Sequence, residues 1–235
     1  PMSARRQRQM CIRDRDDTTV IEVKTFRDGD VVSVTPLQPP EGSDWSWSDG
    51  LAHTEHGWMV ASIDDNALLS FEESGALDQQ ITRPAGGTTL QTPSGIHGEP
   101  DGVWVIEQFS NRIRHLTVNG RELMSFGEEG SDPGQLRFPK ALDVCSRDGW
   151  LAVADLGNYR VQRFDLQGNF IDGFEPPERD HDYPLQLMDL ALNGDCSRMA
   201  LVDSKGDRVL VADKDGTIYG LSLIHISEPT RRPII

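Results

Sequence analysis

Residues 126–174 read FGEEGSDPGQLRFPKALDVCSRDGWLAVADLGNYRVQRFDLQGNFIDGF, and this stretch decides the fold. Within it, the short apolar run 152–154 is closed by Asp155, an alternating segment follows at 160–164, and a tight turn is expected at Gly168. A short apolar run predicts a strand buried on both faces, and alternation predicts a half-buried strand. Because Gly tolerates positive φ, a small or polar residue followed by Gly favours a hairpin turn. The stretch therefore predicts an antiparallel meander.

The same pattern occurs four times. The glycines of four such turns are spaced 45, 48 and 48 residues apart: Gly75, Gly120, Gly168 and Gly216. Thirteen residues before each glycine, an apolar run ends at Ser62, Glu107, Asp155 or Asp203. In three repeats an arginine follows five residues later: Arg112, Arg160 and Arg208. Another short apolar strand precedes each run, which gives four strands per repeat. Four-stranded antiparallel repeats are the blades of a β-propeller, so the predicted class is all-β.

Residues 126–174 closely resemble an NHL repeat, with a PGQ-[FL]…P lead-in, then VAD, then N-x-R-V-Q-x-F-D and the Gly turn. Residues 93–127 match well, with Glu107 in place of Asp, and 48–81 and 187–220 match more weakly. The resemblance covers about 170 residues and implies blades at about 48–81, 93–127, 139–174 and 187–220. A half blade is expected at 16–34, where Asp28-Gly29 lies 46 residues before Gly75.

NHL-like propellers usually close with six blades, so the resemblance implies an incomplete, open arc of about four to five blades that needs further blades to close. The first and last blades of such an arc should present apolar faces to solvent. The expected exposed residues are Leu190, Leu201 and Val209 on the last blade, and Leu51, Val60 and Leu68 on the first.

The two ends, 1–15 and 222–235, share no pattern with the repeats. MCIRDR and SLIHISEPTRR resemble translated sequencing-adapter DNA, so both ends are interpreted as artefacts that lie outside any blade, leaving a propeller fragment at 16–221. The alternative is a pair of genuine basic arms. The overall net charge is −15, and the two ends carry +4 and +1. The residues between them therefore have a net charge of −20.

This acidic balance disfavours nucleic acid and anionic membranes, and it favours cations and basic partners. RNA binding, known for animal NHL proteins, is therefore the least favoured function. A charged surface that serves only solubility remains an alternative. No segment approaches the length of a membrane span. The acidic segment 175–184 is expected to be a connector, with cation or basic-peptide binding as the alternative.

The innermost strands carry the candidate ligand-binding residues. At their third position the four blades place Ala52, His97, Asp143 and Ala191. Strands nearest the axis line the channel where propellers bind small ligands. His97 and Asp143, in adjacent blades, form a candidate site for a divalent metal, and His53 flanks the same level. The alternative is isolated polar residues at the mouth of the channel.

The repeated carboxylates Glu107, Asp155 and Asp203 are interpreted as structural. They are expected to accept backbone N–H bonds in the following turn. The three repeat arginines are expected to form ion pairs between blades, with these carboxylates as candidate partners. Cys145 and Cys196 lie 51 residues apart without a CxxC motif, and we expect them to be buried small hydrophobes.

The leading function is a binding scaffold for a protein or small ligand, through the loop face or the axial channel. The alternative is a metal-dependent lyase or hydrolase with its site in the channel. In peptide-amidating lyases, which share this repeat, a zinc-binding His often follows the Pro before an inner strand. Here Ser94 and Lys140 follow Pro93 and Pro139, which argues against the lyase. The sequence indicates no catalytic residue and no localisation.

Overall fold

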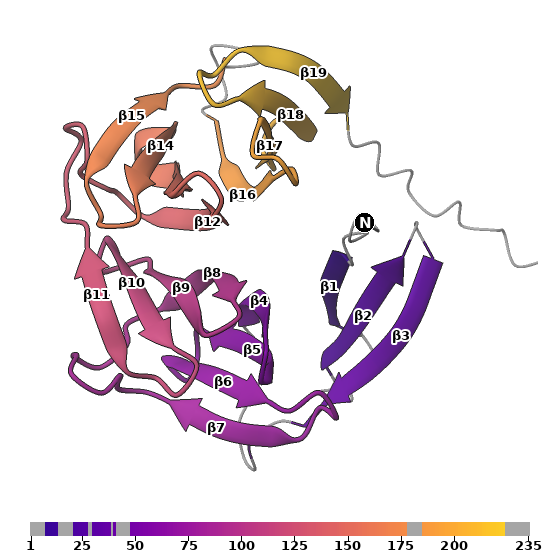
Figure 1. Cartoon of the computed structure of the whole chain (residues 1–235). Coiled ribbons are helices and arrows are strands. Elements are labelled where there is room, and N and C mark those ends of the chain that lie inside the picture. Colours follow the sequence, from indigo (N-terminus) through magenta and orange to yellow (C-terminus); the bar gives the residue numbers. More distant parts are fainter. Residues whose placement is uncertain are drawn as a thin grey trace, which may run out of the picture.

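The computed structural model describes residues 8–13, 21–27, 30–38, 40, 48–177 and 185–223. The described strands form four four-stranded antiparallel sheets and one three-stranded sheet. Each four-stranded sheet is a meander that runs from an inner to an outer strand, and the sheets stand around a common axis as blades (Figure 1). The predicted all-β propeller architecture is confirmed. Among the described residues, no helix is long and apolar enough to cross a membrane.

The strand bounds follow the repeat. Blade one contains β4 (Ser48–Thr54), β5 (Gly57–Ser62), β6 (Ala67–Phe71) and β7 (Leu77–Ile81). Blade two contains β8 (Pro93–Glu99), β9 (Gly102–Glu107), β10 (Arg112–Thr117) and β11 (Glu122–Phe126). Blade three contains β12 (Pro139–Cys145), β13 (Trp150–Asp155), β14 (Arg160–Asp165) and β15 (Phe170–Phe174). Blade four contains β16 (Leu187–Leu192), β17 (Arg198–Asp203), β18 (Arg208–Asp213) and β19 (Ile218–Leu223).

The core lies between the blades. Every residue of β5, β9 and β13 is buried, because each of these strands packs against a neighbouring sheet on both faces. The glycine turns contribute to the same contacts. Gly168 has φ +84°, and a Cβ there would stand 2.6 Å from the ring of Phe126 in the preceding blade. Gly216 meets Phe174 in the same way at 2.5 Å. These two positions therefore require Gly both for the turn and for the close approach of the next blade.

The remaining sheet has three strands: β1 (Arg8–Arg13), β2 (Ile21–Arg27) and β3 (Asp30–Leu37). It covers the face of blade one that points away from blade two. Val23 and Leu37 pack there with Val60, which is fully buried. The expectation of a bare first blade is therefore wrong. Leu68 is also fully buried, and Leu51 is half-buried. The turn at Asp28-Gly29 lies outside the described residues.

Residues 8–13 also correct the interpretation of the ends. They were expected outside any blade, but β1 pairs antiparallel with β2 over its whole length, from Arg8 opposite Phe26 to Arg13 opposite Ile21. At the other end, β19 extends to Leu223, which pairs with Arg208. The backbone edge of a neighbouring strand offers hydrogen bonds to any extended segment, whatever its composition. The structure therefore lends no support to the adapter interpretation.

Blade four is buried on one face. Along β17 and β18 buried and half-buried residues alternate, in contrast to the fully buried β13. Leu190 and Leu201, which were expected to be exposed, pack against blade three with exposures of 4% and 0%. Val209 is half-buried, on the other face. Blade four and the three-stranded sheet stand at the two ends of an open arc (Figure 1). The last blade is thus less buried than blades two and three, as expected. Of the three residues expected on its exposed face, however, Leu190 and Leu201 lie on the face that packs against blade three.

Cys145 and Cys196 form a disulfide that joins blades three and four, with a Cα–Cα distance of 6.0 Å. Both residues are buried, as expected, but they are bonded to each other, so the expectation of two unpaired hydrophobes is wrong. Cys145 ends β12, and Cys196 lies in the turn between β16 and β17. Their separation of 51 residues is close to one repeat, and the repeat brings them to the same end of adjacent inner strands.

Valine-to-alanine substitution at one repeat position tests the open face. Val161 of blade three is fully buried against blade four, whereas Val209 occupies the same position in blade four and faces away. We expect Val161→Ala to lower the free energy of unfolding by about 2 kcal/mol, and Val209→Ala by less than about 1 kcal/mol. Urea unfolding of both variants measures this. Equal losses would mean that the outer face of blade four is covered in solution.

Candidate axial site

A buried carboxylate at the end of the second strand connects each of blades two to four to the segment that enters it. One oxygen accepts a backbone N–H just before the inner strand, and the other accepts the arginine that begins the third strand. The N–H donors are Gln91 for Glu107 at 2.9 Å, Arg137 for Asp155 at 2.7 Å and Gln186 for Asp203 at 3.1 Å. The arginine Nε donors are Arg112, Arg160 and Arg208, at 2.8, 2.9 and 2.8 Å. We call this arrangement the carboxylate clasp.

The clasp corrects the sequence interpretation in two respects. The arginines pair with the carboxylates of their own blade, so these ion pairs do not join different blades. The following turn supplies only a secondary partner: Gly206 donates its N–H to Asp203, and Asn158 donates its side-chain amide to Asp155. The connection to the preceding blade runs through the linker instead, where Arg160 donates to several carbonyls, including Ser131 and Gln135. The carboxylates thus bond mainly to the linker and to the arginine of their own blade.

Replacement of the clasp carboxylate tests this role. Asp155 is fully buried and accepts from Arg137, Asn158, Arg160 and Gln162. Asp155→Asn leaves the Arg160 guanidinium, whose side chain is only 15% exposed, without its counter-charge, so we expect the free energy of unfolding to fall by about 3 kcal/mol. In the exposed turn of blade four, Asp215→Asn should change it by less than about 0.5 kcal/mol. Urea unfolding curves of the two variants give both values, and similar losses would contradict a special role for the clasp.

His97 and Asp143 lie together, as the repeat register predicts. His97 is paired with Trp104, and Asp143 is paired with Ala152. Trp104 and Ala152 occupy the same repeat position, three residues before the clasp carboxylate of their blade. The His97 Nδ1 atom is 2.6 Å from Asp143 Oδ1. Both side chains are partly exposed, at 26% and 19%. The two inner strands β8 and β12 therefore join an imidazole directly to a carboxylate.

Asp143 has a further partner that the sequence did not indicate. Its Oδ2 atom accepts the backbone N–H of Leu192 in β16 at 2.6 Å, and its Oδ1 atom also accepts the N–H of Val144. His97, Asp143 and Leu192 thus connect the inner strands of blades two, three and four. Because both carboxylate oxygens are already used, Asp143 is better placed to orient His97 than to bind a metal itself.

His53 is not part of this group. Its Nε2 atom is 2.5 Å from the Glu73 carboxylate, and its ring contacts that of Trp58 within blade one, with 4.6 Å between the ring centroids and a tilt of 55°. The nearby His56 lies 3.9 Å from Glu55. These contacts direct His53 to its own blade, so the structure does not unite it with His97 and Asp143.

A β-bulge near the start of each inner strand marks a second level of axial residues. The ladder of each blade shifts register there, at Asp49, Ser94, Lys140 and Met188. Lys140 of blade three pairs with Asp49 of blade one, so this contact reaches across the axial space past blade two. The Ser94 side chain is fully buried, and its hydroxyl has no hydrogen-bond partner among the described residues. Sequence reasoning missed Asp49 as a site residue. Its signal was its place directly before the expected inner strand, in which Ala52 is the third residue.

Asp189 completes the acidic surface around Lys140. Loss of solvation in the axial space raises the pKa of Asp189, although its side chain keeps contact with solvent, and the neighbouring carboxylates of Asp143 and Asp49 raise the pKa further. Asp189 thus lies near enough to Asp143 and to Asp49 to be repelled by both, and Lys140 partly offsets this repulsion. We call Asp49, His97, Lys140, Asp143 and Asp189 the axial cluster.

The raised pKa of Asp189 predicts a dependence of stability on pH. The unfolded chain loses this proton at a lower pH than the folded protein, so ionisation of Asp189 destabilises the fold as pH rises above the usual Asp range. Asp189→Asn should therefore raise Tm at pH 7 by about 2 °C and leave it unchanged near ~pH 3. Thermal melts at both pH values measure this, with Asp215→Asn as the charge-matched control. A lower Tm of Asp189→Asn at pH 7 would contradict the repulsion.

Parts of the chain are similar in sequence to known proteins. No family model matches the chain. Peptidyl-glycine α-amidating monooxygenase A of Xenopus laevis is 40% identical over 67 residues, which are 26% of this chain and 7% of that protein. Protein brain tumor of Drosophila melanogaster is 24% identical over 149 residues, 63% of this chain and 13% of that protein. Protein lin-41 of Caenorhabditis elegans is 49% identical over 49 residues, 21% of this chain and 4% of that protein. The chain thus spans only a small part of the length of these relatives.

Two solved structures share most of the arc. Virginiamycin B lyase from Staphylococcus aureus superposes with a TM-score of 0.63 at 18% identity, covering 93% of this chain and 70% of that one. A chain of a nidogen/laminin complex superposes with a TM-score of 0.65 at 16% identity, covering 87% and 72%. The fold is a β-propeller. The matches to protein brain tumor and lin-41 also support repeats of the NHL type. At these identities the solved structures establish the fold alone.

Proposed function

We propose that this propeller is a binding scaffold of the NHL type that recognises a positively charged group of a protein or small ligand at its axial cluster. The observation that carries the proposal is the convergence of Asp49, Asp143 and Asp189 from three inner strands. Only one lysine, Lys140, opposes these three carboxylates within the axial cluster. An incoming ammonium or guanidinium group would relieve their repulsion and form charge-assisted hydrogen bonds.

The electrostatics of the whole chain favour the same class of ligand. The net charge of −15 attracts basic partners and repels phosphates, so nucleic acid is the disfavoured partner. The fold by itself does not choose between binding and catalysis, because it is shared with a lyase and with a chain of a nidogen/laminin complex. The proposal therefore rests on the axial residues of this chain.

A metal-dependent lyase or hydrolase is the second candidate, and the contact between His97 and Asp143 favours it. A histidine that binds a metal often donates its other ring N–H to a carboxylate. His97 would be such a ligand through Nε2, with Asp143 holding its ring. Catalytic zinc takes three protein ligands, however, and the described axial cluster offers one imidazole, with the Asp143 oxygens engaged. The cluster does not fit a resident catalytic metal, so we place this function second.

Fluorescence anisotropy with a labelled oligo-arginine peptide tests the binding proposal. We expect Asp49→Asn combined with Asp189→Asn to weaken binding at least about fivefold, because each lost carboxylate removes a charge-assisted contact. The control combines Asp78→Asn and Asp215→Asn, which remove the same charge from the exposed outer part of blades one and four. This control should change affinity less than about twofold at physiological salt. Equal weakening by both pairs would show non-specific attraction and would overturn the axial site.

A calorimetric titration with Zn²⁺, Mn²⁺ and Mg²⁺ separates the two candidates. A one-to-one complex that His97→Gln abolishes, together with no effect of the axial Asp variants on peptide binding, would favour the metal-dependent enzyme. Peptide binding that depends on Asp49 and Asp189 but not on added metal would favour the scaffold.

A further inference from the structure

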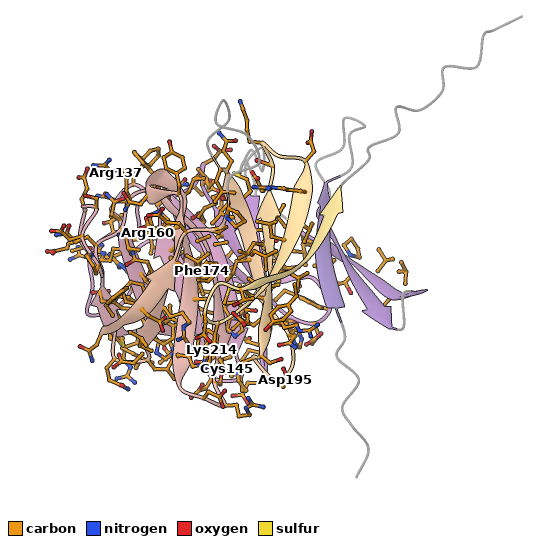
Figure 2. The ribbon with its side chains drawn as sticks, turned by 90° about the horizontal axis from the view of Figure 1, so that it is seen from above. Arg137, Cys145, Arg160, Phe174, Asp195 and Lys214 are labelled. Atoms are coloured by element: carbon orange, nitrogen blue, oxygen red, sulfur yellow. A yellow bond between two sulfur atoms is a disulfide. The ribbon has the colours of Figure 1, made fainter. Side chains whose placement is uncertain are left out.

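The disulfide lies at the opposite end of the inner strands from the bulges that carry Asp49 and Lys140. Figure 2 shows Cys145 and Asp195 together near one pole, with Lys214, while Arg137 and Arg160 lie toward the other. Two hairpin turns meet here, one joining β12 to β13 and the other joining β16 to β17. This pole is therefore separate from the bulges with Asp49 and Lys140, whereas Asp143 of the axial cluster lies two residues before Cys145 in β12.

A third potential ligand stands beside the two sulfur atoms. A carboxylate oxygen of Asp148 lies within 4.8 Å of the Sγ atoms of Cys145 and Cys196, which are themselves bonded. Asp148 follows Cys145 by three residues, and the Cys145 carbonyl accepts the N–H groups of Asp148 and Gly149. This turn brings the side chains of Cys145 and Asp148 to the same side, the spacing that metal-binding C-x-x-C turns use.

The chemistry of the three groups suits zinc. Two thiolates and one carboxylate are three of the four ligands that tetrahedral Zn²⁺ takes, and a water can supply the fourth. Cys145 and Cys196 are buried, whereas the Asp148 side chain is 45% exposed, so the carboxylate side of the group is open to solvent. Arg147 pairs with Asp148, and Lys214 lies at the same pole, so positive charge is available to balance three anionic ligands. Arg147 donates to both oxygens of Asp148 and to the Asp195 carbonyl, so metal binding requires it to release Asp148. The Arg147 side chain is 60% exposed and can exchange these bonds for water.

We propose that Cys145, Cys196 and Asp148 form a zinc site when the disulfide is reduced. A dithiol such as dithiothreitol supplies the two electrons, the S–S bond breaks to give two thiols, and the reductant becomes a cyclic disulfide. Zinc then displaces the two thiol protons, which pass to solvent. In both states the same residues fasten blade four to blade three, covalently when oxidised and through the metal when reduced.

Metal titration of the reduced protein tests the site. After treatment with dithiothreitol and anaerobic removal of the reductant, the full chain should bind one Zn²⁺ here in competition with a chromophoric chelator. The oxidised protein should bind none at this site. Asp148→Asn should weaken the affinity by at least about tenfold, because it removes a ligand. The matched control is Asp195→Asn, which removes the same charge from the adjacent turn, and it should alter the affinity less than twofold.

Cobalt substitution provides a second measurement that depends on the thiolates. Reduced protein with Co²⁺ should show thiolate-to-cobalt charge-transfer absorption, which His97→Gln leaves intact and Cys196→Ser removes. Circular dichroism checks that Cys196→Ser is folded, and Asp148→Asn keeps the test decisive if it is not. The proposal is overturned if reduced protein shows no thiolate–cobalt band, or if Asp148→Asn binds zinc as tightly as the unmodified chain.

Discussion

The buried carboxylate at the end of the second strand determines where each inner strand begins. In blades two to four, one oxygen of this carboxylate accepts the linker N–H, and the other accepts a hydrogen bond from the arginine of the third strand. A single carboxylate therefore holds the linker, the second strand and the third strand together. Blade one carries Ser62 at this position, and among the described residues its hydroxyl bonds to Asp65 in the following turn. The three-stranded sheet packs on the apolar face of blade one and buries it. A buried ion pair of this kind contributes as much to a unique geometry as to stability.

The axial cluster follows from that geometry. The clasp fixes the residue before the inner strand, the bulge comes next, and the third inner-strand position then falls at one level in every blade. His97 and Asp143 meet because their blades share this register. Asp49 reaches Lys140 because the bulges direct both residues toward the same axial space. A change in the linker would therefore move charged groups at the axis.

The sequence predicted the parts of the structure that repeat. A constant offset between carboxylate and glycine fixes strand number, order and register, so the blades and the level shared by His97 and Asp143 could be read directly. It could not predict contacts made by backbone atoms, such as Leu192 N–H with Asp143, because any residue supplies that donor. It also missed the disulfide between Cys145 and Cys196, since spacing alone does not report proximity across blades. The covered face of blade four was assigned incorrectly because its strands are apolar on both faces, where alternation gives no direction.

Blade four contacts blade three at several positions along its strands. Its apolar face packs on blade three, its inner strand donates Leu192 N–H to Asp143, and its β16–β17 turn is bonded through Cys196. The middle attachment shares Asp143 with His97, so the position of blade four is coupled to the axial cluster. The disulfide lies at the opposite end of β12 from Lys140. A change of bonding at Cys145 and Cys196 can therefore alter how firmly blade four is held and, through Leu192 and Asp143, can reach His97. The contact of Lys140 with Asp49 involves no residue of blade four.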